Sequence, residues 1–203
     1  MNYELVSLAV AVTPFSLGMG LTPGPNNIML ASSGAAFGLA RSAPLGSGVV
    51  IGFPLLFVVV GLSAGAVLKV MPTVFTAAKV LGVLYILWLA WKVAHAGEVA
   101  QGDAPARPLG FLQAAAFQWV NPKAWMISLS AAATYVSPRL DLKAQILVIA
   151  AVFVATTAIS CTVWAVFGER IGRLLKTPAQ RRILSLTMAA LLVASIAPVA
   201  LER

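Results

Sequence analysis

The feature that most constrains this chain is a set of uncharged apolar runs long enough to cross a lipid bilayer. The first run extends from Leu5 to Ala40 without a single Asp, Glu, Lys or Arg, whereas a bilayer-spanning helix needs roughly 20 residues. Over all 203 residues, 60% are hydrophobic and 10% are charged, and the mean hydropathy is +0.93. Soluble domains carry roughly 25% charged residues. We therefore expect one integral membrane domain, residues 1–203.

The runs predict an all-α, polytopic membrane protein with about six transmembrane helices. Runs of this length favour helices, because the strands of a membrane barrel would alternate over about ten residues. The expected crossings are Leu5 to Ala40 (broken near its middle), Ala43 to Leu68, Val74 to Val93, Phe111 to Val136, Ala144 to Phe167 and Ile183 to Leu201.

A polar stretch, residues 97–109, separates three expected crossings from three others. An odd number of crossings in each half gives the halves opposite orientations, as in the inverted repeats of many transporters. We therefore predict a 3+3 inverted repeat with halves 1–96 and 110–203. The alternative is six unrelated helices with two proline kinks.

The positive charge is concentrated at helix ends. The net charge is +8, and the densest group runs from Arg170 to Arg182, which is typical of a cytoplasmic loop facing anionic lipid. We predict the lipid bilayer as partner, no nucleic acid, and an N-terminus outside the cell. That topology places inside Arg41, Lys92, Arg107, Arg170, Arg173, Lys176, Arg181 and Arg182, and outside Lys69, Lys79, Arg139, Lys143 and Arg203.

The first run is interrupted by Pro23-Gly24-Pro25-Asn26-Asn27. Proline removes backbone donors, so a helix resuming after Pro25 would present an open N-terminus inside the bilayer. The unpaired N–H groups and the positive dipole end of such a terminus favour an anion such as a carboxylate. A proline kink without a ligand is the alternative.

A second interruption, Asn121-Pro122-Lys123, lies in the run from Gly110 to Pro138. A continuous crossing places Lys123 near the bilayer centre, where an ammonium group is costly unless it faces the protein interior. The competing interpretation makes Trp119 and Trp125 an interfacial belt and the segment re-entrant. The first interpretation predicts one substrate site made by the two interruptions: Pro23, Gly24, Pro25, Asn26, Asn27, Asn121, Pro122 and Lys123.

Catalytic, metal and cofactor sites are not expected. All six acids lie outside the expected crossings, at Glu4, Glu98, Asp103, Asp141, Glu169 and Glu202, while His95 is the only histidine and Cys161 the only cysteine. Neither paired acid–base groups nor a ligand cluster results. Proton coupling, if present, would have to use Lys123, a water path or the substrate.

Small residues recur at spacing four, which permits close helix approach. The pairs are Gly20 and Gly24, Gly34 and Gly38, Gly48 and Gly52, and Gly61 and Gly65. They predict a compact bundle. A homo-oligomer is compatible with the sequence but is not specified by it. The N-terminal residues Met1 to Glu4 lack the basic region of a cleavable signal peptide, so we expect the first run to be retained.

Three motifs resemble those of the LysE/RhtB family of bacterial amino-acid exporters. Pro23-Gly24-Pro25-Asn26 is similar to its N-terminal motif, Phe111 to Met126 with Asn121-Pro122-Lys123-Ala124 to its second signature, and Ala78 to Tyr85 with Trp88 to Lys92 to its third-helix pattern. Gly52-Phe53, Trp88 to Lys92 and the sequence around Trp164 look closest to the cysteine/O-acetylserine exporter branch. Many members have an acid after the glycine where this chain has Phe53.

The resemblance implies a multi-pass protein of the bacterial inner membrane that exports small amino acids. Together with the absence of acids in the crossings, it favours a small neutral substrate of the cysteine/O-acetylserine or threonine/homoserine kind. The alternatives are an exporter of another small metabolite, a non-transporting membrane subunit and a membrane-embedded enzyme. The last of these lacks candidate acid–base groups in the expected crossings.

Overall fold

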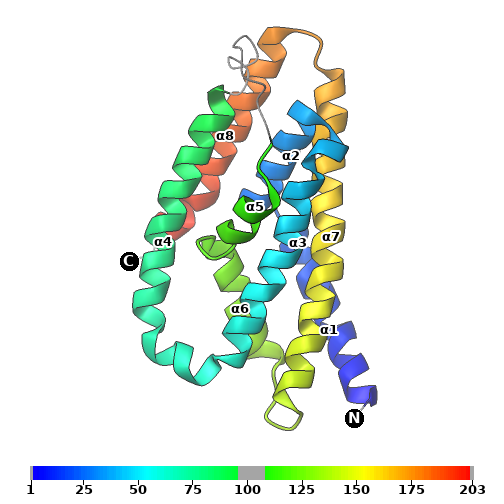
Figure 1. Ribbon diagram of the computed structural model, residues 1–203, viewed down its shortest axis with the longest axis vertical. Coiled ribbons are helices and arrows are strands. Elements are labelled where there is room, and N and C mark those ends of the chain that lie inside the picture. The colour runs from blue at the N-terminus through cyan, green and yellow to red at the C-terminus, as the bar shows by residue number, and fades with distance from the viewer. Residues whose placement is uncertain (1, 96–107, 202–203) are drawn as a thin grey trace.

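A computed structural model describes residues 2–95 and 108–201, and all the regular elements in these ranges are helices (Figure 1). The predicted all-α class is therefore confirmed for the described residues. The helices are α1 (Asn2–Leu21), α2 (Pro25–Phe37), α3 (Leu39–Leu62), α4 (Ala64–His95), α5 (Phe111–Phe117), α6 (Pro122–Tyr135), α7 (Leu142–Leu174) and α8 (Pro178–Leu201).

The helices run up and down along one long axis. In Figure 1, α1 and α2 ascend in succession, α3 descends and α4 ascends; α5 and α6 then descend in succession, α7 ascends and α8 descends. The two successive pairs, α1–α2 and α5–α6, each make one pass through the bundle that is interrupted partway. The remaining passes consist of single helices.

Helix α7 is the central support of the bundle, since it packs against α1, α2 and α3. Helices α4 and α8 pair with each other; α8 also contacts α2, and α4 contacts α3, α5 and α6. Buried apolar side chains form two clusters. One joins α2, α3, α4, α5, α7 and α8 around Leu30, Ile86 and Leu192; the other joins α1, α3, α6 and α7 around Phe57 and Phe153.

Within the part of the chain that the structure describes, three helical segments are long and apolar enough to cross a membrane: Tyr3–Leu21, Leu39–Leu62 and Leu142–Leu174. Their outer faces carry large apolar side chains such as Val10, Ile51 and Leu147. Apolar surface on this scale suits hydrocarbon rather than water. The chain is therefore an integral membrane protein.

Both predicted interruptions are present, at residues 22–24 and at 118–121. The predicted end of the second crossing was wrong: α3 ends at Leu62, not Leu68, and α4 begins at Ala64. The turn at Ser63 keeps a helical hydrogen bond, from its N–H to the Val59 carbonyl at 3.1 Å. Because the residues on both sides are apolar, hydropathy does not mark this turn. The predicted linker lies outside the described residues except for its last two positions.

Of the four glycine pairs, Gly48 and Gly52 alone share one helical face. Gly24, Gly38 and Gly65 each fall on a different element from their partner. A Cβ at Gly48 would collide with the Phe111 carbonyl, so this pair lets α5 lie directly on α3. In the other three pairs the chain turns between the two members, yet close approach persists, since a Cβ at Gly34 would collide with the Ala165 carbonyl.

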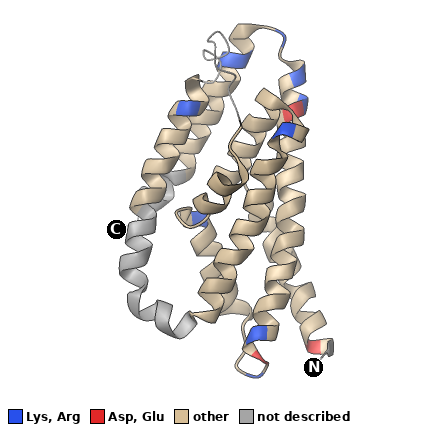
Figure 2. Cartoon of the chain, in the orientation of Figure 1, with Lys and Arg blue, Asp and Glu red and all other residues tan. Residues whose placement is uncertain are grey.

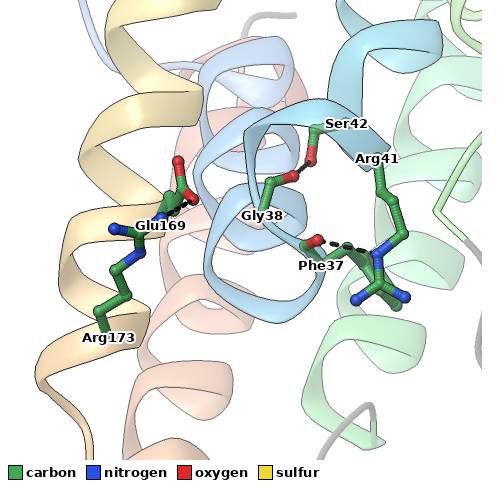
Figure 3. A network of polar contacts seen from close by, with 6 residues as sticks. All are labelled: Phe37, Gly38, Arg41, Ser42, Glu169 and Arg173. Atoms are coloured by element: carbon green, nitrogen blue, oxygen red, sulfur yellow. Dashed lines mark hydrogen bonds and ion pairs between the residues drawn. The ribbon is translucent and has the colours of Figure 1, made fainter.

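The turn between α2 and α3 depends on Gly38, which has φ +81° in the region that favours glycine. Figure 3 shows this turn beside α7: Ser42 Oγ donates to the Gly38 carbonyl at 2.9 Å, and Arg41 Nε donates to the Phe37 carbonyl at 3.0 Å. On α7, Glu169 pairs with Arg173 at 2.6 Å. These contacts fix the end of the bundle at which α2 reverses into α3.

Candidate functional site

The first interruption leaves the N-terminus of α2 open. Helix α1 ends at Leu21, and Gly24 precedes α2 in an extended conformation that supplies no side-chain cap. The first backbone bond of the new helix runs from Ile28 N–H to the Gly24 carbonyl at 3.0 Å. In the described structure no backbone bond satisfies the N–H of Asn26 or Asn27. Such free donors, together with the helix dipole, favour an anion.

The second interruption ends differently. Residues 118–121 form a tight turn with bonds from each N–H to the carbonyl three residues back. The Asn121 side chain then caps α6, because its Oδ1 accepts from Lys123 N–H at 3.2 Å. A capped terminus offers fewer free donors than an open one. The two interruptions are thus unequal, and the open helix end belongs to α2.

Lys123 joins the two interruptions. Its Nζ donates to the Thr22 carbonyl at 2.8 Å and lies 3.5 Å from the Pro23 carbonyl, at the edge of hydrogen-bonding distance. The side chain is half-buried. A charged donor on a carbonyl makes a stronger bond than a neutral one.

A pair of amides forms a second bridge between the interruptions. Asn26 Nδ2 donates to Gln118 Oε1 at 2.8 Å, and Gln118 Nε2 donates to Asn26 Oδ1 at 3.0 Å. Gln118 is fully buried and also donates to the Ala114 carbonyl at 2.9 Å. Every strong hydrogen-bonding atom of the Gln118 side chain is therefore paired.

A third set of contacts attaches α7 to the end of α1. Asn27 Nδ2 donates to the carbonyls of Gly20 (2.7 Å) and Thr22 (2.9 Å), and Ser160 Oγ donates to the Gly20 carbonyl at 2.7 Å. Farther along α7, the hydroxyls of Thr156 and Ser16 are hydrogen-bonded. The side chains of Asn27 and Ser160 thus satisfy carbonyls at the end of α1 that have no partner within the helix.

Between these contacts lies a partly open cavity of about 50 Å³, large enough for a few waters. It lies between the two apolar clusters, with walls from α1, α2, α3, α6 and α7. Its lining contains one charged side chain, Lys123, and no carboxylate among the described residues.

The structure brings most of the predicted site residues to this cavity: Gly24, Pro25, Asn26, Asn27, Asn121 and Lys123. Pro23 and Pro122 are not in the lining, although the Pro23 carbonyl faces Lys123. Trp125 is buried, and its Nε1 donates to the Trp119 carbonyl at 2.8 Å, so it does not serve as an interfacial belt residue.

The prediction missed the contribution of α7. Four lining or adjoining polar residues lie on this helix: Thr156, Thr157, Ser160 and Cys161. Their spacing puts them on one face within an otherwise apolar run, which is a signal the sequence contained. Gln118 was also missed as a site residue; its partner Asn26 is 92 positions away in the chain. For metals, the described residues contain no group of three His, Cys, Asp or Glu side chains.

A bundle of long apolar helices with a polar cavity between two interrupted passes is the architecture of a membrane transport protein. Residues 17–200 match the LysE family, described as LysE type translocators. The chain belongs to the LysE family. Membership makes it a translocator rather than an enzyme.

The chain is similar to proteins named cysteine/O-acetylserine efflux protein. It is 29% identical to the one from Klebsiella pneumoniae over 83% of this chain and 85% of the relative. It is 27% identical to the one from Escherichia coli (strain K12) over 92% of this chain and 94% of the relative. No solved structure was found to match.

Proposed function

We propose that the chain is a secondary transporter that exports a small neutral amino acid or derivative, of the cysteine/O-acetylserine or threonine/homoserine kind, across the bacterial inner membrane. The observation that carries the proposal is the meeting of both interruptions at one cavity, to which each contributes polar side chains. Interrupted helices that supply a helix end and free carbonyls at mid-membrane are the usual substrate sites of secondary transporters.

The substrate carboxylate would bind the open N-terminus of α2. The N–H groups of Asn26 and Asn27 are free there, whereas the start of α6 is capped by Asn121. In this proposal the site is formed by Pro23, Gly24, Pro25, Asn26, Asn27, Asn121, Pro122 and Lys123, extended by Gln118 and Ser160. The last two hold Asn26 and the end of α1 in place.

The cavity lining supports a neutral side chain on the substrate. Lys123 is its one charge, and the described lining has no acid to neutralise a second cation. An unpaired ammonium at low dielectric is costly, so lysine and arginine should be rejected. Val49, Phe53 and Ile127 provide an apolar wall for a short side chain.

The architecture we propose has six crossings in a 3+3 inverted repeat: α1–α2, α3 and α4, then α5–α6, α7 and α8. The two halves begin with the interrupted passes, which run in opposite directions in Figure 1. Transport would alternate access by moving these halves around the cavity.

Transport by the purified chain tests the proposal. Proteoliposomes with and without an imposed pH gradient would be assayed with labelled L-cysteine under reducing conditions, L-serine, L-threonine and L-lysine. We expect transport of at least one neutral amino acid above protein-free liposomes, and none of lysine. Transport of none of the neutral amino acids would contradict the proposal and favour another metabolite or a non-transporting subunit.

The matched control is Lys143→Ala, which removes an exposed lysine at the start of α7, far along the chain from the cavity lining. We expect it to transport as the unchanged chain does. A loss in this variant would show that the assay responds to general damage rather than to the site.

A further inference from the structure

Lys123 occupies a position that suits the ammonium group of an amino acid. Its Nζ lies 2.8 Å from the Thr22 carbonyl and 3.5 Å from the Pro23 carbonyl. These carbonyls directly follow the end of α1, where the helix stops and the dipole end is negative. A primary ammonium with three donors is well suited to such a carbonyl pair.

The fit of the lysine to the turn is close. A Cβ at Gly24 would lie 3.0 Å from both the Cδ and the Nζ of Lys123. The Lys123 side chain therefore lies directly against Gly24, and any residue with a side chain at position 24 would push the lysine away. The contact depends on both interruptions, since the lysine comes from the first turn of α6 and the carbonyls from the break between α1 and α2.

The opposite end of the same turn suits a carboxylate. Pro25 begins α2 two residues after Pro23, and the free N–H groups of Asn26 and Asn27 follow. The turn thus places carbonyl oxygens and amide donors within a few residues of each other. An α-amino acid carries its ammonium and carboxylate on one carbon, so it matches both groups at once.

We propose that the Thr22 and Pro23 carbonyls form the substrate ammonium site, and that Lys123 fills this site when the carrier is empty. An incoming amino acid displaces the lysine from the carbonyls with its own ammonium. The released Nζ is then available to the carboxylate that arrives with it. The inference rests on the proposed function, because it assigns the substrate's groups within that site.

This arrangement has a consequence for turnover. An exporter must return empty after release, and the two carbonyls then need a donor inside the membrane. Lys123 supplies a donor to both carbonyls, beside the Asn27 Nδ2 that also donates to the Thr22 carbonyl at 2.9 Å, because backbone groups inside a membrane need partners. Exchange of one amino acid for another does not need the lysine, because a substrate ammonium occupies the two carbonyls on the outward step and again on the return step.

The first test uses methylammonium chloride and does not depend on transport. In Lys123→Ala the carbonyl pair is open, so methylammonium should raise the thermal midpoint of the detergent-solubilised protein by at least about 2 °C. The unchanged chain should show no such shift. Tetramethylammonium, which has no N–H donor, should stabilise neither. An equal methylammonium shift in both proteins, or none in the variant, would overturn the assignment of the carbonyl pair.

The second test compares net efflux with exchange of labelled L-cysteine in proteoliposomes, using Lys123→Met, which keeps much of the side-chain length. We expect exchange within about threefold of the unchanged chain and net efflux reduced at least about tenfold. Equal loss of both in a folded variant would mean that the loaded carrier needs the lysine. Retention of both would mean that the empty carrier does not need it. Either result overturns the inference.

Failure of the proposed function is distinguishable from failure of this inference. If the unchanged chain moves no amino acid while methylammonium still stabilises Lys123→Ala alone, the cation site stands and the export function does not. If the unchanged chain exports cysteine but methylammonium shifts neither protein, export stands and the cation site does not.

Discussion

At the scale of single residues, the cavity is organised by side chains that satisfy backbone groups freed by the two interruptions. Asn27 and Ser160 satisfy the end of α1, while Asn121 caps α6. Asn26 and Gln118 instead bind each other. In a membrane interior every freed backbone group must find a partner, so these polar residues are needed for the break itself as well as for any ligand.

The reciprocal amide pair allows a prediction on stability. Asn26→Ala and Gln118→Ala should each lower the free energy of unfolding by about 1–2 kcal/mol, because each leaves a buried amide partner unpaired. The double variant should lose less than the sum of the two, with a coupling of about 1 kcal/mol. Unfolding in mixed micelles measures all three. Strict additivity would show that the pair contributes nothing beyond its separate contacts.

The charge of the lining allows a prediction on substrate range. With Lys123 as the single charge and no acid in the described lining, overexpression should raise cellular tolerance to a small neutral amino acid or derivative. Tolerance to the lysine analogue thialysine should not change, because a second cation has no partner. Growth on plates with each compound measures this. Protection against thialysine alone would contradict the electrostatic argument.

The lysine side chain has a separate requirement of shape. Lys123→Arg keeps the charge but replaces a compact ammonium by a planar fork, and the space beside Gly24 is already close. We expect the variant to insert and accumulate, yet to show net export only a little above that of Lys123→Met. Efflux assays normalised to membrane protein level measure this. Full export by the arginine variant would show that charge alone is sufficient.

At the scale of elements, two short helices depend on longer ones: α2 packs mainly against α7, and α6 mainly against α3. Helices α2 and α6 have 13 and 14 residues, too few to cross a bilayer alone, whereas α7 has 33. Helix α2 lies directly against α7, because a Cβ at Gly168 would collide with the Ala31 carbonyl and one at Gly172 with the Ala35 carbonyl. The position of the open helix end therefore depends on these close approaches.

The close approach predicts a contrast between two glycine variants. Gly168→Ala should destabilise the protein by about 1–3 kcal/mol, because its Cβ meets rigid backbone of α2. Gly18→Ala is the matched control: nothing lies within 4 Å of its Cβ, so it should leave stability unchanged or slightly raised through helix propensity. Thermal midpoints in detergent compare them. Equal midpoints would contradict the packing of α2 on α7.

At the scale of the whole molecule, charge distinguishes the two ends of the bundle. Figure 2 shows Lys and Arg gathered mainly at the end where α2 turns into α3 and α7 into α8. The described residues there are Arg41, Lys92, Arg170, Arg173, Lys176, Arg181 and Arg182; Arg139 and Lys143 lie at the other end. The predicted positions Lys69, Lys79, Arg107 and Arg203 have side chains outside the described residues.

This asymmetry predicts the orientation in the membrane. The end with the larger basic group should face the cytoplasm, which leaves the N-terminus outside. Single cysteines at Lys176 and Ser137 test this with a membrane-impermeant thiol reagent on intact cells. We expect labelling at position 137 and protection at position 176, and the buried Cys161 makes the unchanged chain the background control. The reverse pattern would overturn the topology.

The sequence by itself determined the membrane class, the helices and the place of both interruptions. Uncharged length and proline position are local properties, and the bilayer allows few structures that satisfy an apolar backbone. Hydropathy did not locate the Ser63 turn, because apolar residues continue across it. Likewise, spacing did not show that three of the four glycine pairs are split by turns.

Only the tertiary structure decided how the interruptions meet. The contacts of Lys123 with Thr22 and of Asn26 with Gln118 join residues about a hundred positions apart, and no periodicity within either run specifies them. The N-terminus of α6 is capped because the Asn121 side chain points to the Lys123 N–H, whereas the N-terminus of α2 has no side-chain cap. The participation of α7 depended on glycines that let backbones touch. Such contacts arise from three-dimensional packing, so the sequence supplied the polar residues of the cavity while the fold determined their partners.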